Sequence, residues 1–469
     1  MLNTQLLYYK KLTTECKYFY PRLITYTLTS IIVILFYYAI YTNSYLFSEI
    51  RAHPYELPTI TLLKYQIFAS IIYLVIYVVF IRNKINNSIN YIFLGIILLF
   101  IVPLSIFTKP IHSQDEYLIL AFTKGYSSLD INPYSVTIND LPDLEVKKYV
   151  HVWRDVNVMY GPITIFIYYI PSLFNNIQFS LLSLKFFSLI SIIISVFLLA
   201  KYLKDKNYDD DKIADIILLF LVNPFIYFNA LIDTHNDIFM MPLILMGFIY
   251  YTRRNTIASL YVISIAVLIK YVPFILFPVI FYREFTSVKN INKKIITILI
   301  AITLCILNII VFFSFFFEGK ETFKGLYYQL NIPLSNNIDI GYYFTYFLGI
   351  DKLTFKLMGF IISALIAIYL SYKNKLPHSF TYPFIFVFLF VATYFQGWYV
   401  LWIFPLLFII FPFSTILIIT VALVMISSIF TPLQVSAYFF VAIIINIAYL
   451  NRKELYTYMQ YITHKLFHN

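Results

Sequence analysis

Apolar stretches long enough to cross a bilayer recur along almost the whole chain. A helix needs about 20 apolar residues to span a hydrocarbon core, and such stretches include Leu23 to Tyr41, Tyr91 to Phe107, Ile295 to Phe317 and Gln434 to Leu450. The 469 residues are 61% hydrophobic and 12% charged, whereas a soluble domain carries about 25% charged residues. The sequence therefore predicts an all-α, polytopic membrane helix bundle that forms one domain over residues 1–469.

Basic residues lie in short clusters between the apolar segments. The clusters include Lys10 with Lys11, Arg82 with Lys84, Lys201 with Lys204, Arg253 with Arg254, Lys289 with Lys293, Lys373 with Lys375, and Arg452 with Lys453. Positive residues beside spans tend to stay cytoplasmic, so all these clusters are expected on one side, together with the N-terminus. The net charge of +11 is thus explained by topology and gives no reason to expect nucleic-acid binding.

About fourteen spans satisfy this alternation. The predicted spans are residues 23–41, 61–81, 90–108, 179–200, 213–231, 237–252, 256–270, 272–283, 295–317, 353–372, 379–394, 399–412, 413–429 and 434–450. The 272–283 segment is short and could instead be re-entrant. Two long loops then fall on the outer side, at 109–160 and 318–351, and an apolar surface helix at 161–174 follows the first.

The first long loop begins with an acidic pair, Asp115 and Glu116, followed by Tyr117. A carboxylate at the membrane interface could accept the proton of an attacking hydroxyl while the leaving group stays anchored in lipid. The alternative is a solvated acidic pair at a helix start, where negative charge complements the helix dipole. The residues alone leave both interpretations open.

Later in the same loop come Gly125, Asn132-Pro133-Tyr134 and Tyr160-Gly161-Pro162. Proline and glycine at these places fix turns, and Pro162 suits the first position of a helix. Turn formation alone would explain this pattern.

Polar residues also gather at the predicted outer ends of later spans. Asn223-Pro224 precedes the run from Asp233 to Asp237, and ionisable residues in a bundle usually face a cavity or pathway, although a loop can be polar because it is wet. Lys270 before Tyr271 could neutralise a phosphate or extend its ammonium to the interface. Trp398 and Tyr399 are also ordinary interfacial residues.

The sequence contains no Gly-rich nucleotide loop, no His/Cys zinc spacing and no serine nucleophile elbow. Chemistry on a soluble nucleotide sugar or on ATP is therefore not supported.

The order of these segments resembles the C-type (GT-C) glycosyltransferases that use polyprenyl- or dolichyl-phosphate sugars, in particular prokaryotic mannosyltransferase-like members. The matching elements, in order, are Asp115 with Tyr117, Gly125, Asn132-Pro133-Tyr134, Tyr160-Gly161-Pro162, Asn223-Pro224, His235-Asn236-Asp237, Lys270-Tyr271-Val272-Pro273, and Trp398-Tyr399 with Trp402 and Pro405. They cover roughly residues 110–410. The chain departs from the family at Thr234, where glycine is usual, and at Gly161, where the first proline is usual.

The resemblance implies an inverting transfer of a hexose, by default mannose, from a polyprenyl- or dolichyl-phosphate carrier to a glycan or glycolipid on the extracytoplasmic face. No cofactor or metal is expected, and the partners are the lipid-linked donor, the acceptor and the bilayer. The location implied is the plasma membrane, or the endoplasmic reticulum in a eukaryote.

The resemblance also assigns roles to residues. Asp115 matches the base, while Glu116 would orient the acceptor or exchange roles with it. Donor phosphate candidates are Lys270, His235, Tyr271 and Arg154, of which Arg154 has no family match. Candidates for contacting acceptor or sugar are Tyr117, Asn132, Tyr134, Tyr160, Asn236, Asp237, Trp398 and Tyr399.

Two rival functions remain. A transporter or lipid flippase would also be apolar, basic and many-spanning, but it would often show internal repeats and polar residues near the midplane, and neither pattern is seen here. A polysaccharide polymerase would draw on arginines in its large outer loops, and Arg154 is the one arginine in the two long loops here.

Overall fold

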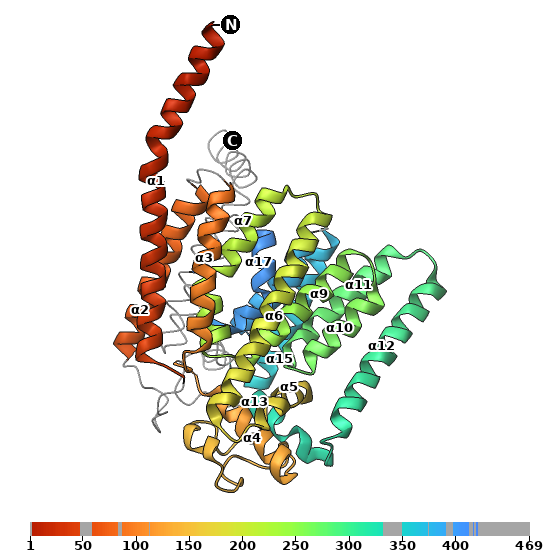
Figure 1. Ribbon diagram of the computed structural model, residues 1–469. Helices are drawn as coiled ribbons and strands as arrows, with labels where there is room; N and C mark the ends of the chain where they lie inside the picture. Colours follow the sequence, from red (N-terminus) through yellow and green to blue (C-terminus); the bar gives the residue numbers. More distant parts are fainter. Residues whose placement is uncertain are drawn as a thin grey trace.

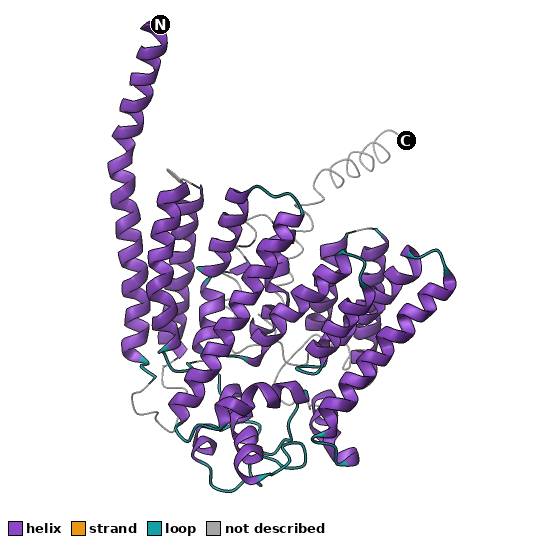
Figure 2. Ribbon diagram, turned by 45° about the vertical axis from the view of Figure 1, so that its right-hand side comes forward, coloured by secondary structure: helices purple, strands orange, loops and turns teal. Residues whose placement is uncertain are grey.

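The protein is described by a computed structural model that covers residues 2–46, 59–82, 87–111, 113–331, 349–373, 375–390 and 397–411, with positions 416, 419 and 420. Within these ranges the chain is helical, and the β contacts amount to one isolated antiparallel bridge between Tyr45 and Thr108 (Figure 2). The predicted all-α membrane bundle is confirmed.

Six helical segments are long and apolar enough to cross a membrane. They lie in α1 (Leu2–Asn43), α2 (Thr59–Ile76) continued by η1 (Tyr77–Arg82), α3 (Asn87–Ile106), α6 (Ile177–Asp205), α12 (Ile291–Ser314) and α15 (Lys352–Tyr372). Their mean hydropathy ranges from 1.9 to 3.0, and many of their large apolar side chains are exposed, as expected for residues facing lipid.

Several predicted spans are shorter or broken in the structure. The helix α7 (Asp210–Leu221) bends by 41° into α8 (Pro224–Ile226) and η3 (Tyr227–Ile232). The bend has a local cause, because the Asn223 side chain accepts a hydrogen bond from the Phe225 N–H and Pro224 lacks a donor. This pair counts as a seventh candidate span.

The other helices that follow α7 in the bundle are also shorter than the six long spans. They are η4 (Asn236–Phe239), α9 (Met240–Thr252), α10 (Thr256–Val267), η5 (Val272–Leu276), α11 (Phe277–Ser287), α16 (Leu376–Phe390), η7 (Gly397–Ile403) and α17 (Phe404–Ile410). The predicted span 272–283 is thus divided between η5 and α11. The predicted spans 413–429 and 434–450 lie outside the described residues, apart from positions 416, 419 and 420, so the count of about fourteen stays a prediction.

The two long loops form one end of the bundle. The first contains α4 (Asp115–Leu129) and η2 (Glu145–Tyr149) and leads into α5 (Pro162–Ser172), while the second contains η6 (Gly319–Phe323) and α13 (Lys324–Asn331). Figure 1 shows α4, α5 and α13 together at the end opposite the N-terminus. The apolar helix expected at 161–174 corresponds to α5, and the 15-residue α4 begins at the acidic pair, where a helix start was one of two interpretations.

The two loops are joined to each other. The Asn132 side-chain amide donates to the Phe316 carbonyl (2.9 Å) and to Glu318 Oε1 (2.8 Å). Gly325 of α13 packs so closely on the first loop that a Cβ there would lie 2.0 Å from the Val158 carbonyl oxygen. Residues 332–348 of the second loop lie outside the described residues.

Candidate functional site

The acidic pair begins α4, where the helix dipole favours negative charge. The Gln114 side-chain oxygen accepts hydrogen bonds from the backbone N–H groups of His151 and Val152. The start of α4 is thereby fixed to the last part of its own loop.

Asp115 lies at the edge of a buried cluster formed by residues far apart in the sequence. Its Oδ2 is 4.0 Å from Nδ1 of His235, and the Asp115 side chain is 20% exposed while that of His235 is 0% exposed. The His235 ring stacks on Trp398 at a centroid distance of 3.9 Å and an interplanar angle of 12°. The turn before His235 places Thr234 in the left-handed region with φ of 55°, which explains the family's usual glycine here.

An ion pair forms the second part of this cluster. Lys270 Nζ lies 2.8 Å from Asp237 Oδ1 and 3.1 Å from Oδ2, and the Trp402 indole N–H also donates to Asp237. The Lys270 ammonium faces three aromatic rings, with centroids at 4.4 Å for Tyr399, 5.5 Å for Trp402 and 5.6 Å for Tyr160. Such contacts stabilise a cation that has left water.

Tyr160-Gly161 brings the end of the first loop against Lys270. The Gly161 N–H donates to the Ile269 carbonyl (2.9 Å), and a Cβ at position 161 would lie 2.1 Å from the Leu268 carbonyl oxygen. A proline could make neither contact, because it has a Cβ and no N–H. Gly161 in place of the family's proline is therefore required by this close approach.

The Tyr160 carbonyl accepts hydrogen bonds from the hydroxyls of Tyr134 (2.9 Å) and Tyr271 (3.4 Å). Both tyrosines were predicted as substrate contacts, and both support the loop that carries Tyr160.

The two acids have different environments. Burial raises the pKa of Asp115 to about 6, an effect opposed by the positive charge of Lys270 and by a hydrogen bond from Tyr160, and reinforced by the charge of Asp237. Burial raises the pKa of Glu116 well above its usual range, and the charges of Asp233 and Asp115 add to this. Among the described residues, neither Glu116 carboxylate oxygen has a hydrogen-bond partner, and the residue is 0% exposed.

Three further predicted site residues lie outside the Asp115 cluster. Arg154 donates to Asn139 Oδ1 (3.0 Å) and to the Val150 carbonyl (2.8 Å), and so holds its own loop together. Asn132 joins the two loops, and the buried Tyr117 ring packs against Tyr149 at 5.4 Å.

Two residues near the site were not assigned from the sequence. Lys185 is fully buried in α6, and Asp233 is fully buried just before the His235 turn. A signal for Lys185 existed, because it is the one charged residue in the predicted span 179–200 and such residues are usually functional.

Among the described residues, no three His, Cys, Asp or Glu side chains lie close enough together to hold a metal ion. Metal independence stays a prediction.

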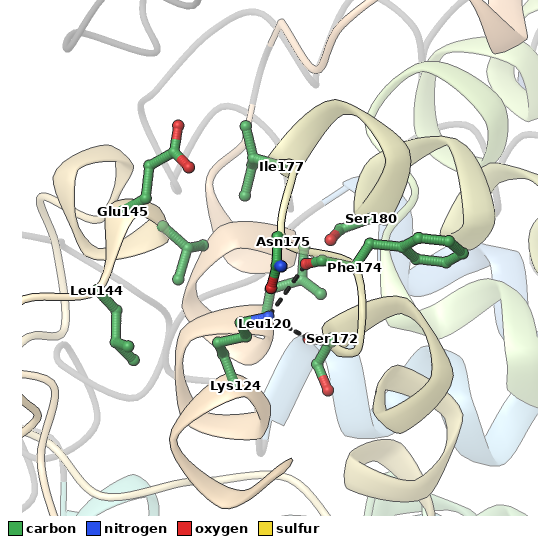
Figure 3. Close-up of a pocket in the computed structure, with 10 residues that line it drawn as sticks. Leu120, Lys124, Leu144, Glu145, Ser172, Phe174, Asn175, Ile177 and Ser180 are labelled. Atoms are coloured by element: carbon green, nitrogen blue, oxygen red, sulfur yellow. Dashed lines mark hydrogen bonds between the residues drawn. The ribbon is translucent and has the colours of Figure 1, made fainter. Parts of the chain in front are cut away.

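Figure 3 shows a separate pocket beside the C-terminal half of α4, where Lys124 donates to the carbonyls of Ser172 (2.8 Å) and Phe174 (3.1 Å). Lys124 follows Asp115 by about 2.5 helical turns and so projects from the opposite side of α4. The pocket is therefore not part of the Asp115 cluster.

Comparison with known proteins identifies the family. No curated protein and no solved structure matches the chain. The family model for alpha-(1->6)-mannopyranosyltransferase, N-terminal domain, matches residues 44–284, which is more than half of the 469 residues and contains Asp115, His235 and Lys270. The chain is a membrane glycosyltransferase that belongs to this alpha-(1->6)-mannopyranosyltransferase family, as the order of its motifs predicted.

Proposed function

We propose that this mannosyltransferase takes mannose from a polyprenyl- or dolichyl-phosphate carrier and transfers it, with inversion, to a hydroxyl of a glycan or glycolipid on the extracytoplasmic face. The observation that carries the proposal is the placement of Asp115, partly exposed and with a raised pKa, beside the buried His235 and the Lys270–Asp237 pair.

The Asp115 cluster suits a single displacement. Asp237 is occupied by Lys270 and Trp402, and Glu116 is buried, so Asp115 is left as the carboxylate that a substrate can reach. The acceptor oxygen forms a bond to the anomeric carbon, its proton passes to Asp115, and the bond from that carbon to the phosphate oxygen breaks with its electron pair. One displacement inverts the configuration.

The leaving phosphate gains negative charge as its bond to the sugar breaks. Lys270 and His235 lie beside Asp115 and are suited to stabilise that charge in a site shielded from water. The internal contacts of Arg154 argue against it as a third phosphate ligand.

Unpaired polar atoms border the cluster. Within the described residues, the Thr234 hydroxyl, both polar atoms of the Asn236 side chain and the Trp398 indole N–H are buried without a hydrogen-bond partner. Buried polar groups are nearly always paired in native structures, so sugar hydroxyls or phosphate oxygens are suited to be their missing partners.

The donor assignment is tested with labelled sugar and purified enzyme. Transfer is measured from polyprenyl-phosphate mannose, from the corresponding glucose donor and from GDP-mannose without a carrier, with Asp115→Asn as the control protein. We expect transfer from the lipid-linked mannose and an inverted anomeric linkage in the product. Direct use of GDP-mannose would refute the assignment.

The face is tested with single cysteines in a background without Cys16 and Cys305. Val152→Cys, in the exposed part of the first loop, should be labelled from outside, and Lys204→Cys, exposed at the far end of α6, should be labelled from the cytoplasm. That pattern would support the proposed outer face for the first loop and for Asp115 within it. The reverse labelling pattern would overturn the proposed face.

A further inference from the structure

We infer that Lys185 of α6 is a positioning residue, whose buried ammonium holds the turn that presents His235 to Asp115. The inference rests on the proposed function, because it assumes that this pair acts in transfer. The hydrogen bonds of Lys185 described below go to backbone carbonyls before the His235 turn, not to Asp115.

The position of Lys185 is energetically costly. It lies eight residues into α6, which is about 12 Å along a helix axis, and it is 0% exposed. Removing an ammonium from water costs several kcal/mol unless it finds partners. An ammonium buried at this depth therefore needs polar contacts that offset this cost.

Its contacts are specific. Lys185 Nζ donates to the backbone carbonyls of Leu231 and Ile232, which are the last two residues of the π-helix η3. Carbonyls at a helix end have no partner within the helix. Lys185 supplies that partner from a neighbouring helix, and its positive charge suits the negative end of the dipole.

The segment held in this way leads directly to His235. The Asp233 N–H donates to the Phe228 carbonyl and the His235 N–H to the Asn229 carbonyl, both at 3.0 Å. The chain then reverses through Thr234, whose φ is 55°. A strained turn of this kind persists when its surroundings fix it, and the Lys185 contacts lie at its base.

The same region also fixes the approach to α4. Asp233 Oδ1 accepts a hydrogen bond from the Ile111 N–H at 2.7 Å, four residues before Asp115. The charges that act most on Lys185 are those of Asp233 and Glu116. The buried lysine therefore lies within electrostatic reach of the carboxylate that links the His235 turn to the Asp115 segment.

Removal of the ammonium should displace the His235 turn, and because His235 acts on charge that develops in the transition state, the loss should fall mainly on kcat. A displacement of about 1 Å can cost about 10² in rate. We expect Lys185→Met to lower kcat by about 10- to 100-fold with little change in KM for polyprenyl-phosphate mannose. Ser188→Ala is the matched control, since Ser188 is also fully buried in α6 and should keep wild-type kcat.

The deciding measurement is a double-mutant cycle with Asp115→Asn on purified enzyme. A variant without the base gains nothing from a His235 ring that is presented to that base, so the Lys185 substitution should cost less in the Asp115→Asn background than in the wild type. If Lys185 had only a structural role, the rate losses of the two single variants would multiply in the double variant, and that result would overturn the inference. If Lys185→Met does not accumulate in membranes, Lys185→Gln, which keeps N–H donors, replaces it in the cycle.

The single variants distinguish a failure of the Lys185 inference from a failure of the proposed function. Wild-type kcat in the Lys185 variant beside an inactive Asp115→Asn would overturn this inference alone. Full activity of Asp115→Asn would overturn the proposed function and this inference with it.

Discussion

Two ionic clusters meet at the start of α4, and they differ in what they contact. The Asp115 cluster contains His235, the Lys270–Asp237 pair and aromatic rings, and Asp115 itself is 20% exposed. The Glu116 cluster contains Lys185 and Asp233, and all three side chains are fully buried. Consecutive residues project about 100° apart around a helix, so one turn sends two adjacent carboxylates into different surroundings.

The difference shows how chemistry and support are divided. The Asp115 cluster has polar atoms left for a substrate, namely those of Asn236 and Trp398. In the Glu116 cluster the Lys185 ammonium donates to two backbone carbonyls, and the Asp233 carboxylate accepts from a backbone N–H. The first cluster is therefore suited to react, and the second to hold the reacting groups in place.

The largest expected effect comes from exchanging the base for its neutral isostere. Asp115→Asn should lower transfer by about 10²–10⁴, the usual contribution of positioned proton transfer, with normal expression because the residue lies outside the apolar spans. Glu116→Gln should be much milder, because the Glu116 side chain is 0% exposed and a substrate hydroxyl cannot reach it.

Initial rates with labelled polyprenyl-phosphate mannose measure both variants. Near-full activity of Asp115→Asn with an inactive Glu116→Gln would reverse the roles of the two clusters.

The next effect concerns the ion pair of the Asp115 cluster. Lys270→Met should lower kcat by about 10²–10³, as loss of one group that stabilises developing charge does. It should also destabilise the fold by about 3–5 kcal/mol, since Asp237 is left as a buried unpaired charge. Kinetics and thermal unfolding in detergent measure the two effects separately.

The double variant Lys270→Met/Asp237→Asn separates catalysis from folding. It removes the unpaired charge and should regain stability while transfer stays low. If transfer also recovered, the role of Lys270 would be only to pair with the charge of Asp237.

The sequence predicted the Asp115 cluster better than the Glu116 cluster. Motif order was enough to group Asp115, His235, Lys270 and Trp398, which the structure brings together. It could not tell which acid faces inward, because that depends on the rotation of α4. Nor could it show that Lys185 reaches the end of η3, because partners 46 and 47 residues apart leave no local pattern.

The fold was also predicted better in some regions than in others. Apolar length identified the long spans, but residues 115–129, which form α4, were placed in the long loop between two spans, with only a possible helix start at the acidic pair. The middle of α4 is buried by the loops around it, and that packing is a tertiary effect.

A smaller effect is expected on the pH profile. Below pH of about 6 Asp115 is protonated and cannot accept a proton, so kcat/KM should rise with pH through that value. Tyr160→Phe removes a hydrogen bond that favours the charged carboxylate, so the pKa should rise and the acidic limb should move up by about half to one pH unit.

The ring that faces Lys270 is kept in Tyr160→Phe, so donor KM should change little. Tyr169→Phe, on α5, is the control. A limb that moved to lower pH would contradict the assignment of this pKa to Asp115.

The smallest effect on transfer is expected at Arg154, which the sequence offered as a phosphate ligand. Its guanidinium is bonded to Asn139 and to the Val150 carbonyl within the first loop, and phosphate binding would require those bonds to break. Arg154→Gln should therefore lower the unfolding temperature but leave kcat and donor KM nearly unchanged. A large rise in donor KM at normal stability would instead mean that the loop rearranges on binding and brings Arg154 to the phosphate, so that the Asp115 cluster extends further than its contacts here indicate.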